Sequence, residues 1–295
     1  MCELLGLSFA RPISADFFLR EFEHRDEENP DGWGLAWYPD RSLAIVKEPV
    51  EWGKSKHSGF LETYLGLCAR LYIGHVRHKT TGGPPSRADT HPFSRELAGR
   101  EYCFAHNGTL AGPYWELPLG RFKPIGSTDS EHLFCHLLEE IAVRAGRQPP
   151  GDPLASKDNW IWLYGKLTAL NRWGRINCLF SDGQRLFCYH DAAGWKGLTI
   201  REVFIPDWNK RSFADPDVQV HLESDSVNHG YVVATRPLSQ KGWISFQPGE
   251  LMVLENGRVV FSSQNPQGMV SAARSAPHVP TLPDQLPKTS GVSSP

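Results

Sequence analysis

The chain has 295 residues, with 31 basic and 33 acidic side chains and a formal net charge of -2. This near-neutral balance disfavours a nucleic-acid binder that works by neutralising phosphates. Hydrophobic residues make up 40% and charged residues 22%, the proportions of a folded globular protein. No apolar run approaches the roughly 20 residues of a membrane-spanning helix, and the N-terminus lacks the basic leader of a signal peptide. Six cysteines without a CxxC pair favour reduced thiols, so we expect a soluble, cytoplasmic protein.

The first third of the chain predicts one helix followed by strands. Ser14 is a suitable N-cap for a helix that carries phenylalanines at 17, 18 and 22. Strand formers at 32–38 and 43–47 predict a hairpin, and residues 71–77 predict a buried strand with a polar far end. A Gly-Gly-Pro-Pro run at 82–85 forces a loop. Residues 101–108 predict another strand, which ends in a turn.

The middle of the chain predicts two helices. Thr128 as N-cap and Glu131 three residues later form a capping box, and apolar residues then follow on one helical face. After a Pro-rich stretch at 149–153, apolar residues at helical spacing predict a second helix over 159–172. Gly174 is a suitable stop for it.

The last third of the chain predicts short strands. Hairpins over 175–189 and 251–261 turn at Asp-Gly and Asn-Gly pairs, with further strands between them. We expect one domain over 2–262 and a polar, Pro- and Ser-rich tail over 263–295. Runs of strands with a few helices indicate an α+β fold in which helices lie outside two packed sheets.

Cys2 is the first candidate for chemistry. When the initiator Met is removed, the thiol lies beside a free α-amino group whose pKa of about 7.7–8.0 suits a general base. An N-terminal amine activates Ser and Thr nucleophiles by the same logic. Taken alone, Cys2 is more simply an N-terminal cysteine of no consequence.

Three further features are ambiguous one by one. Arg77 ends a predicted strand, where it can hold a carboxylate or lie in a basic surface turn. Asn107-Gly108 offers an amide and a backbone N–H for an oxyanion hole, or forms an ordinary type I′ turn. Asp129 starts the capped helix, where it can meet a ligand ammonium or simply favour the helix dipole. Together with Cys2 they match the carboxylate, ammonium and acyl centre of a γ-glutamyl compound.

Six ordered motifs carry a resemblance to a known family, the class II, N-terminal-nucleophile glutamine amidotransferases, and to its stand-alone branch in particular. The motifs are MCELLG at 1–6, DGWGLAWY at 31–38, GHVRHKTTGG at 74–83, THPF at 90–93, FAHNGTL at 104–110 and STDSE at 127–131. Weaker matches extend the resemblance over roughly residues 2–260. The resemblance implies a four-layer αββα sandwich of two antiparallel sheets, of the Ntn-hydrolase type.

The resemblance also implies roles for individual residues. Cys2 is the nucleophile and Asn107 with Gly108 forms the oxyanion hole, while Arg77 and Asp129 hold the glutamine. Thr80 lies beside the substrate carboxylate, and His91, counted with the substrate-binding residues, supports a strand end together with His75. Ammonia-donating relatives commonly read GHxRWATHG, so His78, Lys79 and Thr81 replace a Trp, an Ala and a His. In those relatives the Trp forms a lid over the nucleophile, and because His78 replaces it here, no residue is assigned to that lid.

The expected activity is cleavage of the γ-amide of glutamine through a thioester on Cys2, without a cofactor. We expect no synthase domain after residue 262, so ammonia passes to a separate partner or to none. The alternatives are a stand-alone hydrolase of γ-glutamyl peptides or thiol metabolites, and an inactive ligand-binding relative. No motif identifies the leaving group, whose specificity we assign to loops at 52–60, 111–125 and 190–215.

A metal enzyme is a weaker reading. His75, His78, His91 and His106 cluster in the sequence, but zinc needs three or four converging ligands. Because side chains alternate along a strand, His75 and His78 would face opposite sides of the sheet. We therefore expect no metal.

Overall fold

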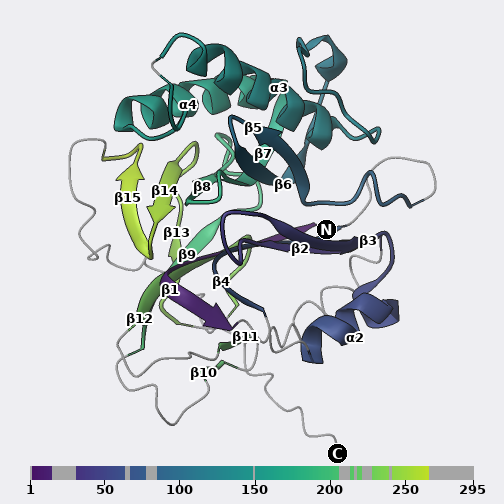
Figure 1. The fold of residues 1–295 in the computed structure, drawn as a ribbon, viewed down its shortest axis with the longest axis vertical. Helices are drawn as coiled ribbons and strands as arrows, with labels where there is room; N and C mark the ends of the chain where they lie inside the picture. Colours follow the sequence, from purple (N-terminus) through teal and green to yellow (C-terminus); the bar gives the residue numbers. More distant parts are fainter. Residues whose placement is uncertain are drawn as a thin grey trace, which may run out of the picture.

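The computed structural model describes residues 2–14, 31–63, 67–77, 85–148, 150–205, 213–215, 218–220, 228–238 and 241–265. Two antiparallel sheets stack face to face within these residues (Figure 1). The seven-stranded sheet has the order β13-β9-β12-β1-β4-β2-β3 and the six-stranded sheet the order β15-β14-β8-β7-β6-β5. A separate two-stranded ribbon pairs β10 with β11.

The strands of the larger sheet are β1 (Glu3–Ser14), β2 (Trp33–Trp37), β3 (Ala44–Glu48), β4 (Cys68–Val76), β9 (Thr199–Ile205), β12 (Asn228–Ala234) and β13 (Ile244–Ser245). Those of the smaller sheet are β5 (Phe93–Leu97), β6 (Arg100–Leu110), β7 (Gly174–Ser181), β8 (Arg185–Tyr189), β14 (Leu251–Glu255) and β15 (Arg258–Ser262). The ribbon is β10 (Phe213–Asp215) and β11 (Val218–Val220). The helices are α2 (Lys56–Thr63), α3 (Asp129–Ala145) and α4 (Lys157–Leu170), with single turns η1 (Trp52–Lys54), η2 (Tyr114–Glu116) and η3 (Asn171–Trp173).

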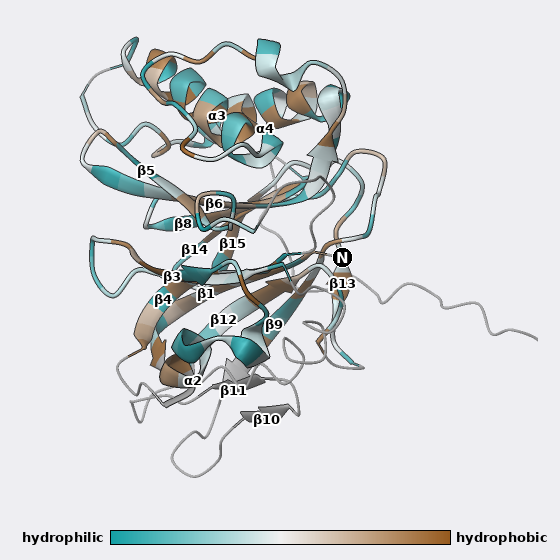
Figure 2. Cartoon of the chain, turned by 90° about the vertical axis from the view of Figure 1, so that its right-hand side faces the viewer, coloured by the Kyte–Doolittle hydropathy of each residue, from teal (hydrophilic) through white to brown (hydrophobic). Residues whose placement is uncertain are grey.

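Helices cover the outer face of each sheet, so the molecule has four layers (Figure 2). Helices α3 and α4 bury one apolar cluster against the six-stranded sheet, and α2 contributes Leu61 to a second cluster under the seven-stranded sheet. A third cluster fills the space between the sheets. The fold is therefore the expected α+β sandwich of the Ntn-hydrolase type.

Side-chain alternation assigns each residue of the central strands to a layer. Leu5 and Leu7 of β1 pack in the cluster on the α2 side, whereas Leu4 packs between the sheets. On β6, Cys103 and Ala105 face the inter-sheet space, and Phe104 faces the helices. Because the period is two, Cys2 and Asn107 fall on the inter-sheet side.

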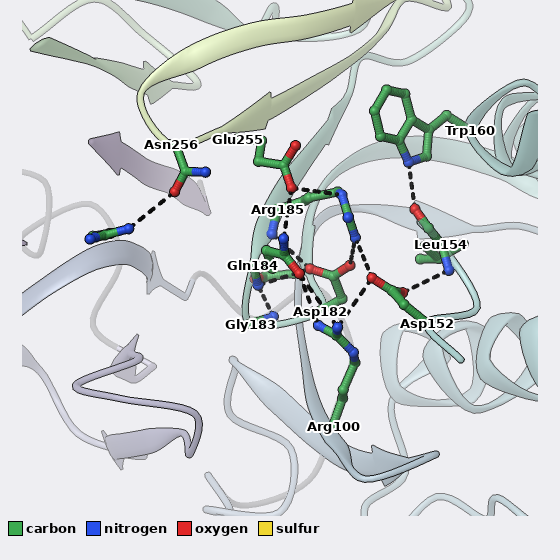
Figure 3. Close-up of polar contacts among 12 residues, drawn as sticks. Arg100, Asp152, Leu154, Trp160, Asp182, Gly183, Gln184, Arg185, Glu255 and Asn256 are labelled. Carbon is green, nitrogen blue, oxygen red and sulfur yellow. Dashed lines mark hydrogen bonds and ion pairs between the residues drawn. The ribbon is translucent and has the colours of Figure 1, made fainter. Parts of the chain in front are cut away.

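An ion-pair network lies at the β7–β8 turn, at the opposite end of β6 from Asn107 (Figure 3). Arg185 Nη1 lies 2.8 Å from one carboxylate oxygen each of Asp152 and Asp182, and its Nε lies 3.2 Å from Glu255 Oε1. Arg100, at the start of β6, reaches the same oxygen of Asp152 at 3.2 Å. Burial raises the pKa of Asp182, and the positive charge of Arg185 opposes that rise. The network ties the β7–β8 turn to the connection between α3 and α4.

Most of the predicted elements are confirmed. The hairpins β2–β3, β7–β8 and β14–β15 form as expected, and the last turns through Asn256 and Gly257, both with positive φ. The capping box is half formed: Thr128 Oγ1 accepts a bond from Glu131 N at 3.2 Å, but the Glu131 carboxylate accepts from Gly126 N instead. The second helix ends at Leu170, and Gly174 follows the extra turn η3.

Several predictions about local structure are wrong. Ser14 is the last residue of β1 rather than a helix N-cap, and the helix predicted after it lies outside the described residues. The strand expected to turn at Asn107-Gly108 continues to Leu110, because β7 pairs with it throughout. The three segments treated as loops all contain regular structure: 52–60 holds η1 and most of α2, 111–125 holds η2, and 190–215 holds β9 and β10.

Two other expectations concern the ends and surroundings of the chain. Residues 266–295, most of the predicted tail, lie outside the described residues, so the domain boundary at 262 stays a prediction. Within the described part of the chain, no helix has both the length and the apolar character needed to cross a bilayer.

Candidate functional site

Cys2 lies at the start of the strand at the centre of the larger sheet. Strand β1 pairs with β12 on one side and β4 on the other, so both neighbours fix the position of its first residues. Cys2 is partly buried, and its thiol is not in a disulfide. The next residue, Glu3, is buried and forms an ion pair with Arg236 at 2.8 Å. That pair lies on the α2 side of the sheet, away from the side that Cys2 faces.

Asn107 brings the second sheet to Cys2. Its Nδ2 donates a hydrogen bond to the Cys2 carbonyl oxygen at 2.6 Å, and Asn107 is itself 1% exposed. An amide nitrogen carries two hydrogens, so one remains for a ligand. The sequence analysis placed Cys2 and Asn107 in one candidate site, and this hydrogen bond joins the two residues directly between the sheets.

Close packing of the neighbouring residues, rather than a turn, requires glycine at position 108. A Cβ at this position would lie 1.9 Å from the Arg175 carbonyl oxygen and 2.4 Å from His106 Nε2. Gly108 pairs with Ile176 of β7 inside the ladder. Only glycine fits between the carbonyl and the ring.

Arg77 follows β4 directly and lies beside Cys2 in register. Glu3 pairs with Val76, so one further step along the ladder sets Cys2 opposite Arg77. Backbone hydrogen bonds to Gly32 and Asp31 hold the other side of Arg77. The residue is 8% exposed, and its Nη1 has no hydrogen-bond partner among the described residues. A buried guanidinium nitrogen without a partner is costly, so a ligand oxygen fits this position.

Asp129 is the first residue of α3 and is tied to the end of β6. Its Oδ2 accepts a hydrogen bond from Leu110 N at 2.7 Å, and its Oδ1 accepts one from Ser130 N at 2.8 Å. Ser130 Oγ also lies 3.3 Å from Oδ1, so Oδ2 is the oxygen that retains a lone pair for a further donor. The carboxylate therefore offers negative charge to a ligand ammonium, at the end of the strand that also carries Asn107.

His106 connects these elements, although the sequence suggested it only as a possible metal ligand. Its Nε2 lies 3.0 Å from the Arg175 carbonyl oxygen, which only accepts, so Nε2 carries a hydrogen. In the neutral ring Nδ1 is then an acceptor, and Ser130 Oγ donates to it at 2.8 Å. Burial lowers the pKa of His106, and the negative charge of Asp129 opposes this. The ring thus links β6, β7 and the start of α3.

His75, two residues before Arg77, packs its ring against that of His91 at an angle of 33°. Their ring centroids are 4.2 Å apart, and none of their ring nitrogens has a hydrogen-bond partner among the described residues. Burial, and next the charge of Arg77, lower the pKa of His75 to about 3. Burial also holds the pKa of His91 well below its usual range, with the charge of His75 as the next cause. His91 contacts its histidine neighbour and Phe93, which fits support of the strand ends.

Lys47 fixes the segment that carries His91. Its Nζ donates to the carbonyl oxygens of Thr90 at 2.6 Å and Pro92 at 3.1 Å, which joins the edge strand β3 to the other sheet. Burial lowers the pKa of Lys47 to about 8. The neighbouring Gly34 permits this approach, because a Cβ there would lie 2.2 Å from the His91 carbonyl oxygen.

Two residues considered in the sequence analysis have no described position. Thr80 and His78 lie outside the described residues, so the structure does not place them. Among the residues that are described, no three His, Cys, Asp or Glu side chains form a group able to hold a metal ion.

The fold and this arrangement define the class of protein. Two antiparallel sheets between helical layers, with Cys2 at the start of a central strand, form the architecture of the Ntn hydrolases. The chain belongs to the class II glutamine amidotransferases, because the profile of the family described as "Glutamine amidotransferases class-II" matches residues 1–278.

Individual relatives agree with this family. A Methanocaldococcus jannaschii protein, MJ1515, is 38% identical over 273 residues, which cover 90% of this chain and 72% of the relative. YafJ of Escherichia coli K12, whose name proposes a glutamine amidotransferase, is 31% identical, with coverage of 85% and 96%.

Solved structures agree as well. A Pseudomonas aeruginosa PA01 protein described as an expected glutamine amidotransferase superposes with a TM-score of 0.62 at 27% identity, covering 88% of this chain and 99% of that one. Glutamine phosphoribosylpyrophosphate amidotransferase of Bacillus subtilis superposes with a TM-score of 0.59 at 19% identity. This chain covers 49% of that enzyme, and at such identity the likeness shows the fold alone.

Proposed function

We propose that the protein hydrolyses the γ-amide of glutamine through a γ-glutamyl thioester on Cys2. The observation that carries this proposal is the hydrogen bond from Asn107 Nδ2 to the Cys2 carbonyl oxygen at 2.6 Å. It joins a thiol that can act as nucleophile to an amide that can stabilise an oxyanion. Arg77 lies beside Cys2 in register, and its Nη1, which has no partner among the described residues, supports the binding of the substrate carboxylate.

The reaction begins with the α-amino group that removal of Met1 would free. This amine takes the thiol proton, and the thiolate attacks the γ-carbonyl carbon. The resulting oxyanion is stabilised by the second hydrogen of Asn107 Nδ2 and the backbone N–H of Gly108. The tetrahedral intermediate collapses, the C–N bond breaks, and the ammonium form of the N-terminus returns its proton to the leaving ammonia. Water then attacks the thioester with the same amine as base and releases glutamate.

The glutamyl half is held by two charged groups. Arg77 binds the α-carboxylate with its planar guanidinium, and Asp129 accepts the α-ammonium. Thr80 and His91 complete the binding residues in this proposal, Thr80 beside the carboxylate and His91 as support for the strand ends. The ammonia is released to water or to a separate synthase. We place the reaction in the cytoplasm, because none of the six cysteines is in a disulfide, as in a reducing compartment.

The test is release of glutamate from L-glutamine by the purified protein, with Cys2→Ala as the blank. Cys68→Ala is the matched control, since Cys68 is also a partly buried cysteine outside any disulfide. We expect turnover in the wild type and in Cys68→Ala, and none in Cys2→Ala. The mass of the intact chain should show that Met1 is removed. Glutamate release that persists in Cys2→Ala overturns the proposal.

A further inference from the structure

The hydrogen bond between His106 and Ser130 lies between two groups of the proposed site. His106 precedes Asn107, the proposed oxyanion donor, on β6. Ser130 follows Asp129, the proposed partner of the substrate ammonium, at the start of α3. His106 Nδ1 lies 2.8 Å from Ser130 Oγ, and both residues are buried. One hydrogen bond therefore joins the strand that would meet the γ-carbonyl group to the helix that would meet the ammonium group.

The ring of His106 is held at both of its nitrogens. Nε2 carries the hydrogen, because it lies 3.0 Å from the Arg175 carbonyl oxygen, which only accepts. Nδ1 of the neutral ring is then an acceptor, to which Ser130 Oγ donates. The ring lies over Gly108, where a Cβ would come within 2.4 Å of Nε2. The ring is thus a fixed anchor for the Ser130 hydroxyl.

The same hydroxyl contacts the carboxylate of Asp129. Ser130 Oγ lies 3.3 Å from Asp129 Oδ1, and Ser130 N donates to this oxygen at 2.8 Å. On the other side of the carboxylate, Leu110 N donates to Oδ2 at 2.7 Å. These contacts fix the plane of the carboxylate and leave the second lone pair of Oδ2 for a ligand. Asp129 is half-buried, so it is the member of this group that a ligand can reach.

We propose that Ser130, anchored by His106, is a positioning residue that holds the Asp129 carboxylate in the orientation that binds the α-ammonium of the substrate. The inference rests on the proposed function. It assigns the preference for a free α-amino group to a pair of buried residues that act through Asp129. A γ-amide that lacks the α-amino group gains nothing from this arrangement.

The test compares two substrates that differ only in the α-amino group. L-Glutamine carries this group, and glutaramate, the monoamide of glutaric acid, has a hydrogen in its place. The readout is the ratio of kcat/KM for ammonia release from the two compounds, with Cys2→Ala as the blank. The ratio is taken within each variant, so a general loss of stability or activity cancels. A side chain that only supports the fold would leave the ratio unchanged.

The variants remove the hydroxyl, keep it or remove its anchor. Ser130→Ala removes it, Ser130→Thr keeps it, and His106→Phe replaces the anchoring ring by one without an acceptor. Ser156→Ala is the matched control, because Ser156 is the N-cap of α4 and its Oγ accepts from Asn159 N at 3.3 Å. This control weakens the start of another helix on the same sheet. If the buried His106→Phe variant does not fold, the Ser130 variants decide the proposal.

We expect glutamine to be favoured over glutaramate by about 10- to 150-fold in the wild type and in Ser156→Ala, the effect of a hydrogen bond to a charged group. Ser130→Ala and His106→Phe should each lower this ratio by about 2- to 10-fold. The double variant should lower it no further, because both changes remove the same bond. Ser130→Thr should keep most of the ratio.

Two results would overturn the inference and leave the proposed function standing. One is a ratio that Ser130→Ala leaves at the wild-type value, and the other is a ratio that Ser130→Thr lowers as far as Ser130→Ala does. Equal use of the two compounds by the wild type also overturns the inference and removes Asp129 as the ammonium partner. If neither compound gives Cys2-dependent ammonia, the proposed function fails together with the inference.

Discussion

The close packing around Gly108 gives a prediction whose size follows from distances. In Gly108→Ala the new Cβ would meet the Arg175 carbonyl oxygen at 1.9 Å and His106 Nε2 at 2.4 Å, whereas ordinary contact begins at 3.4 Å. The oxygen belongs to the backbone of β7, so it can retreat by the required distance of about 1.5 Å only if the β6–β7 ladder separates. That movement also breaks the bond between Arg175 and the buried ring of His106.

The expected cost follows from these two effects. Overpacking costs about 1–3 kcal/mol, and loss of one buried hydrogen bond adds about 1 kcal/mol. We therefore expect Gly108→Ala to lower the free energy of unfolding by about 2–4 kcal/mol. At about 2–4 °C per kcal/mol, Tm should fall by roughly 5–15 °C. Glutamate release should fall by about 10² or more, because the proposed oxyanion donor at Gly108 is displaced.

The assay is calorimetric unfolding together with glutamate release from glutamine. Gly165→Ala in α4 is the matched control, because nothing lies within 4 Å of a Cβ at that position. Alanine is the better helix former by about 1 kcal/mol, so this control should be as stable as the wild type or slightly more stable. A Gly108→Ala protein with the Tm of the wild type would refute the packing argument, whatever its activity.

Three further predictions concern the site. Asn107→Ala should lower kcat by about 10²–10³ with little change in KM, since it removes the proposed oxyanion donor; an unchanged kcat measured with glutamine contradicts this. Arg77→Ala should mainly raise KM for glutamine, and Arg77→Lys should restore part of the loss; equal KM values in all three proteins would remove Arg77 from the binding residues. His75 is neutral in the folded state down to a pKa of about 3 but titrates near 6.5 when unfolded, so the folded state binds fewer protons between these values. Stability is therefore lost as pH falls below about 6.5, and urea titrations should show that the wild type loses about 2–3 kcal/mol more than His75→Phe between about pH 6.5 and about pH 4.5. If the free energies of unfolding of the two proteins change in parallel with pH, burial of the His75 ring does not contribute to the pH dependence of stability.

Local signals predicted those elements whose structure is decided locally. The turns at Asn256-Gly257 and Asp182-Gly183 and the N-cap at Thr128 depend on residues within a few positions, and all three form. Strand β1 gave no such signal. Leu4 and Leu5 are both buried, on opposite faces of the sheet, so the sequence shows no alternation.

Long-range pairing decided what the sequence missed. Asn107-Gly108 has the composition of a turn, but eight ladder pairs with β7 hold it in a strand. The ordered motifs predicted a site of Cys2, Arg77, Asn107 and Asp129, and the structure brings the first three together. The contacts of His106 with Ser130 and Arg175, and of Asn177 with Trp195, join residues at least 18 positions apart. No spacing rule in a single sequence shows such contacts.

The central position of β1 has a consequence for motion. Leu5 is paired with Ala234 on one side and Gly74 on the other, so its neighbours cannot open without separating two ladders. Amide hydrogens in such a strand exchange with solvent only when most of the domain unfolds. The residue that follows Met1 is thereby anchored to the slowest-exchanging part of the molecule. We therefore expect the Cys2 thiol to stay in place when the loops around it change conformation.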